Sequence, residues 1–228
     1  MQQKRKTLIS AIQKAYYPTQ TTTLMHLLKA LIFLGLTTCL CAQQPLKLSW
    51  GPDAFVLDKT FKINDSTQIK LTQFKFYLEA KNQHAKPTIL LVDAADTNLF
   101  SLPNSVATIQ LGIDPELQMA SDFKGALDPI NGMYWTWNSG YIQLKCTGDL
   151  ISMATKQEKH FELHLGGMQA PWICMYPLSG TGHEIVFDVA IWLTSIYQNQ
   201  SGIPTIMQPS AMSVAIFNFV KEAFYYAR

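Results

Sequence analysis

The sequence has few charged residues and no cluster of basic residues beyond its first 42 positions. Only 15% of the 228 residues are Asp, Glu, Lys or Arg. A protein that binds nucleic acid needs clustered Lys and Arg to neutralise phosphates, with aromatic side chains between them to stack on bases. The chain lacks this pattern, and we expect no nucleic-acid partner.

Common catalytic motifs are also missing. The sequence contains no GxxxxGK[ST] phosphate loop, no GxGxxG dinucleotide loop, no HExxH metalloprotease motif and no nucleophile elbow. Nothing supports hydrolase or nucleotide chemistry, so we expect a protein that is not an enzyme. Repeats, low-complexity linkers and breaks in composition are absent after residue 42, which favours a single domain over residues 43–228.

The apolar run near the N-terminus is too short for a membrane span. Residues 30–36 read ALIFLGL, whereas a bilayer needs about 20 apolar residues. Basic residues precede this run and small residues follow it, which is the order of a secretory signal peptide over residues 1–42. We expect cleavage after Ala42, with Met25 as an alternative start. The mature chain would then lie in the periplasm or cell envelope, without a transmembrane anchor.

Cleavage after Ala42 would change both the charge and the cysteine content. It removes five of the 18 Lys and Arg and none of the 16 Asp and Glu, which leaves a net charge of −3. It also removes Cys39 and Cys41, either of which is a weaker candidate for lipid anchoring. Cys146 and Cys174 remain, and in an oxidising compartment they would most simply form a disulfide. The alternative is a pair of thiolate ligands for a soft metal.

Apolar and polar residues alternate through most of the mature chain, and this period of two predicts β-strands. We expect such strands over residues 43–50, 69–79, 88–93, 106–113, 156–165 and 183–192. From Pro209 onward, apolar residues recur at helical spacing, and Ser210 is a suitable N-cap. The predicted fold is mainly β, an antiparallel β-sandwich with a C-terminal amphipathic helix.

Residues 127–144, LDPINGMYWTWNSGYIQL, hold two of the five tryptophans between turn signals on both flanks. On a β-strand, Met133, Trp135 and Trp137 would line one face. Such a face is large, electron-rich and oxidisable. The alternative interpretation is an ordinary strand of the hydrophobic core.

Residues 156–165, KQEKHFELHL, place two histidines and a glutamate on one face of a predicted strand. His160 and His164 would be about 13 Å apart at Cα, too far for both to bind one metal from a straight strand. Glu162 lies between them and could orient either imidazole by accepting a hydrogen bond from its second ring nitrogen. The alternative is a pair of histidines on a solvated face. His183 is a further candidate with the same ambiguity.

Five segments of the chain carry a resemblance to a known family. They are KFYLEA at 75–80, LGIDPE at 111–116, GALDPINGMYWTWNSGYIQLKCTG at 125–148, FELHLGG at 161–167 and IMQPSAMSVAIFNFVKEAF at 206–224. In this order they resemble the MbnP-like family of exported bacterial copper-binding proteins, which is named from a methanobactin operon.

The resemblance implies a copper site built on an oxidised tryptophan. In the related copper proteins a tryptophan is converted to kynurenine by a diheme peroxidase-like (MbnH-like) partner, and its aromatic amine joins histidines around copper. By motif, Trp135 or Trp137 would be the modified residue and His164 an imidazole ligand. Imidazole and an aniline-type nitrogen are borderline donors that suit copper.

The sequence departs from the family pattern at the second ligand. Some relatives have a histidine two residues after the modified tryptophan, where this chain has Trp137 or Ser139. A second ligand would have to come from His160, His183, His84 or Met133.

Two functions therefore remain open. The first is an exported protein that captures or delivers copper without turnover of its own. The second is a structural or interaction module of the cell envelope, with both tryptophans in the core.

Overall fold

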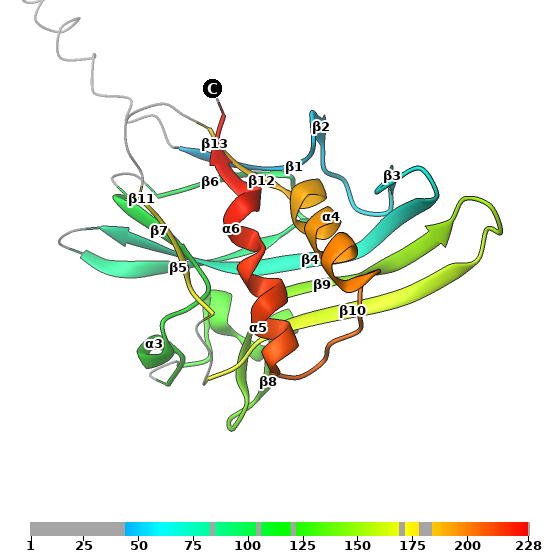
Figure 1. Cartoon of the computed structure of the whole chain (residues 1–228). Coiled ribbons are helices and arrows are strands. Elements are labelled where there is room, and N and C mark those ends of the chain that lie inside the picture. Colours follow the sequence, from blue (N-terminus) through cyan, green and yellow to red (C-terminus); the bar gives the residue numbers. More distant parts are fainter. Residues whose placement is uncertain are drawn as a thin grey trace, which may run out of the picture. The chain divides into compact units, whose positions relative to one another are not determined.

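Two β-sheets pack face to face as a sandwich, and a group of helices lies against them (Figure 1). The computed structural model describes residues 44–82, 85–103, 106–119, 122–168, 172–177 and 184–227. The predicted mainly-β sandwich is confirmed.

The smaller sheet has the order β13-β12-β1-β2, with β6 also paired to β1. Its strands are β1 (Pro45–Trp50), β2 (Asp53–Ala54), β6 (Leu99–Ser101), β12 (Ile185–Asp188) and β13 (Phe224–Tyr226). The pairing of β1 with β12 is parallel, with Leu46 opposite Ile185. The sheet is therefore mixed, although its other pairings are antiparallel, and the sandwich as a whole is mostly antiparallel as predicted.

The larger sheet has the order β10-β9-β4-β7-β11, and its strands pair in antiparallel fashion. Shorter strands β3 and β5 pair with β4, and β8 pairs with β9. The bounds are β3 (Thr60–Lys62), β4 (Thr67–Asn82), β5 (Ala85–Asp93), β7 (Thr108–Leu111), β8 (Tyr134–Thr136), β9 (Gly140–Ser152), β10 (Glu158–Gly166) and β11 (Cys174–Pro177).

The core lies between the two sheets and is rich in aromatic side chains. Phe74 and Phe76 of β4 are fully buried, and their rings lie 5.4 and 5.2 Å from the ring of Phe187 on β12. Aromatic pairs at such distances stabilise a core beyond the area that they bury. The contact between β4 and β12 thus holds the two sheets together.

The strand predicted over residues 183–192 is only partly correct, because the chain turns into helix α4 (Val189–Gln200) after β12. The side chain of Asp188 accepts hydrogen bonds from the backbone N–H groups of Ala190 and Ile191, as an N-cap does. The buried residues of the helix follow its period of 3.6: Val189, Trp192, Leu193 and Ile196. Apolar residues also alternate with a period of two around Val189, and this pattern led to the prediction of a strand instead of a helix.

The predicted C-terminal helix is confirmed, although it is broken into two pieces. Helix α5 (Ala211–Asn218) begins with a capping box between Ser210 and Ser213, and α6 (Val220–Ala223) follows it. The chain then ends in β13, an edge strand that the helical spacing did not predict. Three shorter helices, α3 (Pro115–Met119), η1 (Gly125–Leu127) and η2 (Pro129–Asn131), lie between β7 and β8. None of the helices in the described part of the chain is long and apolar enough to cross a membrane.

The disulfide predicted between Cys146 and Cys174 is not formed; both are buried free thiols. Cys146 lies on β9 and Cys174 on β11, and β4 and β7 separate these strands. Three strand spacings correspond to about 14 Å, whereas the Cα atoms of a disulfide lie within about 7 Å. The same separation excludes a shared metal, and burial raises the pKa of each thiol.

Asp188 should be essential for stability, because its carboxylate also accepts a hydrogen bond from the backbone N–H of Gly51. We expect Asp188→Ala to lower the free energy of unfolding by about 1–3 kcal/mol, since it removes a helix cap and leaves a part-buried donor unpaired. Exposed Asp53 is the matched control, and Asp53→Ala should change the value by less than about 0.5 kcal/mol. Equal effects in denaturant titrations would contradict this assignment.

Candidate functional site

The outer face of the larger sheet carries the histidines of β10. Phe161, Leu163 and Leu165 are fully buried toward the sandwich core. Because side chains alternate along a strand, His160, Glu162 and His164 point to the opposite face. The alternation predicted for this strand is confirmed.

Glu162 lies between the two histidines and contacts both. One carboxylate oxygen is 3.7 Å from Nε2 of His160 and the other is 3.3 Å from Nε2 of His164. The Nδ1 atom of His160 is 2.8 Å from a carboxylate oxygen of Asp149 on β9. A carboxylate therefore separates the two rings, and His160 already has a partner of its own.

His164 differs from His160 in burial. Its residue is 7% exposed, whereas the His160 side chain is 55% exposed. Nε2 of His164 has no hydrogen-bond partner among the described residues, because the 3.3 Å contact with Glu162 lacks hydrogen-bond geometry. Three other buried side-chain atoms lack partners among the described residues, on Ser49, Gln143 and Trp172. Of the four, only an imidazole nitrogen is a common metal ligand.

Burial lowers the pKa of His164 below its ordinary 6.5, and the ammonium group of Lys145 lowers it further, while the Glu162 carboxylate opposes both. Lys145 is opposite His164 on β9. The imidazole is therefore neutral at pH 7, the form in which histidine binds metals. Lys145 also donates a hydrogen bond of 3.3 Å to the carbonyl of Gly132, which ties the aromatic segment to this part of the sheet.

The aromatic segment does not form the single face that a strand over residues 133–137 predicted. Strand β8 ends at Thr136, whose hydroxyl accepts a hydrogen bond from the N–H of Ser139 in the turn. Met133 is fully buried, Trp135 is half-buried, and Trp137 is 81% exposed in the turn. The placement of Trp137 in a core is therefore wrong, because the strand stops before reaching it.

Met133 and Trp135 belong to a second, smaller core on the outer side of the larger sheet. It also includes Tyr77 and Tyr141, whose ring centroids lie 5.9 Å apart, and Tyr134 packs against it with its ring centroid 4.8 Å from that of Tyr141. This cluster anchors the segment, so that β8 and its turn have a defined position.

Gly167 allows three distant parts of the chain to meet at the end of β10. A Cβ atom there would lie 2.8 Å from Cγ of Pro209 and 3.5 Å from the carbonyl oxygen of Ser139. Its φ of +121° also favours glycine. The turn that carries Trp137, the strand that carries His164 and the segment before α5 are therefore close together.

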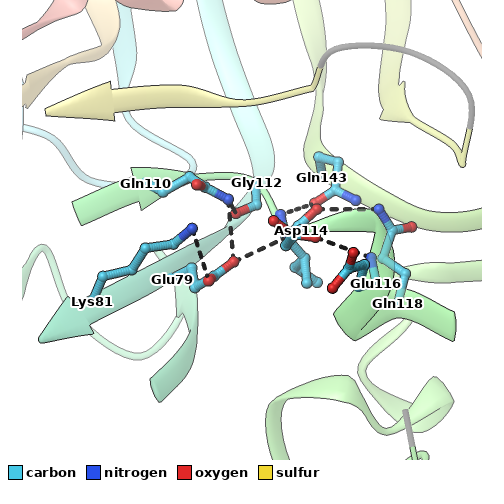
Figure 2. Close-up of polar contacts among 9 residues, drawn as sticks. Glu79, Lys81, Gln110, Gly112, Asp114, Glu116, Gln118 and Gln143 are labelled. Atoms are coloured by element: carbon cyan, nitrogen blue, oxygen red, sulfur yellow. Dashed lines mark hydrogen bonds and ion pairs between the residues drawn. The ribbon is translucent and has the colours of Figure 1, made fainter. Parts of the chain in front are cut away.

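A buried polar network holds the loop after β7, which contains the LGIDPE segment (Figure 2). One oxygen of Glu79 accepts hydrogen bonds of 3.1 Å from the side chain of Gln110 and from the N–H of Asp114, and the other contacts Lys81 at 3.2 Å. The side chain of Gln143 accepts a hydrogen bond of 2.8 Å from the N–H of Ile113.

The alternation and the motifs of the sequence did not predict this network. Its signal is a charged or amide residue inside an otherwise apolar strand, because such residues are buried only when paired. The network joins β4, β7 and β9 and thereby supports the strand on which Lys145 lies. The network therefore contributes to the site by holding β9, and with it Lys145, in place.

A family model described as MbnP matches residues 44–208. The chain belongs to the MbnP family. Neither the curated proteins nor the solved structures include a significant match to it. The matched range contains the aromatic segment, β10 and Ile206, so each part of the site lies within the MbnP match.

The residues of this MbnP protein fit one edge of a metal site. Nε2 of His164 and an oxygen of Glu162 are 3.3 Å apart, and two ligands of a tetrahedral metal with bonds of about 2.0–2.1 Å are separated by about this distance. The described part of the chain has no group of three or more His, Cys, Asp or Glu that could hold a metal. His84 and His183 lie outside the described residues. A complete metal site would need further donors, either from these two histidines or from side chains other than His, Cys, Asp and Glu.

Replacing Lys145 should raise the pKa of His164. In Lys145→Met the positive charge is lost, so the pKa should move toward 6.5, as measured by an NMR titration of the ring. Between the folded pKa and 6.5 the unfolded state binds more protons, so stability falls as pH decreases through this window. In Lys145→Met the two pKa values lie closer together, so this pH range should be narrower. Lys159→Met, an exposed charge on the same strand, is the control, and an unchanged pKa in Lys145→Met would contradict the assignment.

Proposed function

We propose that this MbnP-family protein is an exported copper-binding protein that captures or delivers copper and has no turnover of its own. The observation that carries the proposal is the buried Nε2 atom of His164, which has no hydrogen-bond partner and lies beside the Glu162 carboxylate. Leaving a buried polar atom unpaired costs about 1–3 kcal/mol. A metal ion bound at Nε2 would remove this cost, and of the four unpaired buried atoms only this one is of a type that commonly binds metals.

The charges around His164 also suit a copper ligand. The lowered pKa keeps the imidazole unprotonated at pH 7, so a metal need not displace a proton. The carboxylate of Glu162 offers a negative charge next to the bound cation. Copper would supply a Lewis-acidic ion of borderline to soft character, for which imidazole is a favourable ligand.

We infer that a tryptophan of the aromatic segment is oxidised to kynurenine and provides a further donor. Trp137 is 81% exposed and is accessible to a diheme peroxidase-like partner, while Trp135 is half-buried against the second core. An exposed tryptophan in this turn contributes little to stability, so its oxidation would leave the fold intact. Export rests on the signal-peptide pattern of residues 1–42, which lie outside the described residues.

The alternative function, a structural module without metal, gains support only from Met133 and Trp135. Both pack in the second core and would be needed in any member of the fold. This alternative assigns no role to the unpaired nitrogen of His164 or to the exposed Trp137.

Copper titration of the exported chain tests the proposal. We expect His164→Ala to weaken copper binding at least about tenfold, because it removes a direct ligand. His160→Ala is the matched control, since His160 lies on the same strand face but is paired with Asp149; it should bind nearly as the unmodified chain does. Equal binding by all three proteins, or affinity no better than micromolar, would refute the proposal.

Intact mass tests the tryptophan oxidation. The chain produced beside a diheme peroxidase-like partner should show the mass shift of a tryptophan-to-kynurenine conversion. The double variant Trp135→Phe/Trp137→Phe should lack this shift, and the two single variants assign it to one residue. Trp137→Phe should leave the midpoint of thermal unfolding nearly unchanged, because the side chain is exposed. Unmodified protein from cells that contain the partner would argue against the oxidation.

A further inference from the structure

The segment before helix α5 lies along the free edge of β10. Ile206 forms a parallel bridge with Leu163. Its carbonyl accepts a hydrogen bond of 2.7 Å from the N–H of His164, and its own N–H donates one of 2.7 Å to the carbonyl of Glu162. The segment therefore continues the larger sheet by one short strand-like contact, more than 40 residues away from β10 in the sequence.

Continued by one residue, this parallel register pairs Met207 with His164. In a parallel pair the residues that follow bridge partners are also neighbours, and adjacent strands are about 4.8 Å apart. Side chains alternate between faces: Ile206 is buried with Leu163, whereas Thr205 and Met207 are exposed. Met207 thus leaves the segment on the face that carries Glu162 and His164.

The exposure of Met207 indicates that it does not serve the core. It is 52% exposed, although a methionine side chain is apolar and flexible and usually fills gaps in a core. A thioether sulfur is a soft donor that favours Cu(I). The His, Cys, Asp and Glu side chains of the described residues form no group of three that could hold a metal. A thioether sulfur is a further kind of ligand outside that set.

The charge distribution also favours the edge with Met207. On the other side of His164 lies the ammonium group of Lys145, close enough to lower the pKa of the imidazole. A cation would be repelled there. The segment on the opposite side offers a neutral thioether and leaves the Glu162 carboxylate accessible, since this side chain is 31% exposed.

We propose that Met207 supplies a thioether ligand to the His164 site and makes it selective for Cu(I) over Zn(II). This inference rests on the proposed function, since it assigns a further protein ligand to the same site. The thioether sulfur adds a soft donor beside the imidazole nitrogen and the Glu162 oxygen. Cu(I) readily accepts a thioether, whereas the usual Zn(II) ligands in proteins are thiolate, imidazole and carboxylate.

Anaerobic competition against a chromophoric Cu(I) chelator tests the assignment. We expect Met207→Leu, which keeps the volume of the side chain but removes the sulfur, to weaken Cu(I) binding at least about tenfold. Its Zn(II) affinity should stay near that of the unmodified chain. Met175→Leu is the matched control, because Met175 is 60% exposed but lies on β11, at the other edge of the larger sheet; it should bind Cu(I) normally.

The outcomes separate this inference from the proposed function. If His164→Ala loses Cu(I) binding and Met207→Leu does not, the thioether ligand is wrong and the copper site stands. If neither change matters, both are wrong. A second measurement uses Ag(I) as a redox-inert probe: the ε-methyl NMR signal of Met207 should shift on Ag(I) addition, while that of Met175 should not. An unshifted Met207 signal would also overturn the assignment.

Discussion

The alternation of side chains along β4, β9 and β10 is the constraint on which the rest of this structure depends. The inner faces of these strands must be apolar to pack against the smaller sheet, as Phe74, Cys146 and Leu163 do. Every second residue is then directed to the outer face, where His164 and Lys145 become neighbours on paired strands. A shift by one residue would bury the charged side chains and expose the core, so the pairing that holds the sandwich together also determines the composition of the site.

On the outer face of the larger sheet, two sites differ in whether their buried polar side-chain atoms have hydrogen-bond partners. Around Glu79, each oxygen of the carboxylate has partners, and the network stabilises the loop after β7. At His164, one buried nitrogen is left unpaired beside a carboxylate. The network is not complete either, because Nε2 of Gln143 also lacks a partner among the described residues. Of these two unpaired nitrogens only the imidazole nitrogen is of a type that commonly binds metals.

The second core explains why the aromatic segment has a defined position. Its most exposed ring, that of Trp137, makes few packing contacts of its own. Met133 and Tyr141 are fully buried there, and Trp135 packs at the margin. The turn at residues 137–139 is consequently held at the end of β10, next to Gly167 and Pro209. An exposed tryptophan on a rigid turn is available to a partner protein without loss of the fold.

The sequence alone determined the features that follow from local periodicity and from motifs. The alternation in residues 156–165 predicted the faces of His160, Glu162 and His164, Ser210 predicted the start of the C-terminal helix, and the ordered motifs predicted the MbnP family. Only the tertiary structure decided which distant residues meet. The pairing of Leu163 with Ile206, the position of Lys145 opposite His164 and the separation of Cys146 from Cys174 depend on strand order and register. Strand order and register are set by the packing of the whole sandwich. Backbone hydrogen bonds alone do not select them, because they can form between any two strands, however far apart these are in the sequence.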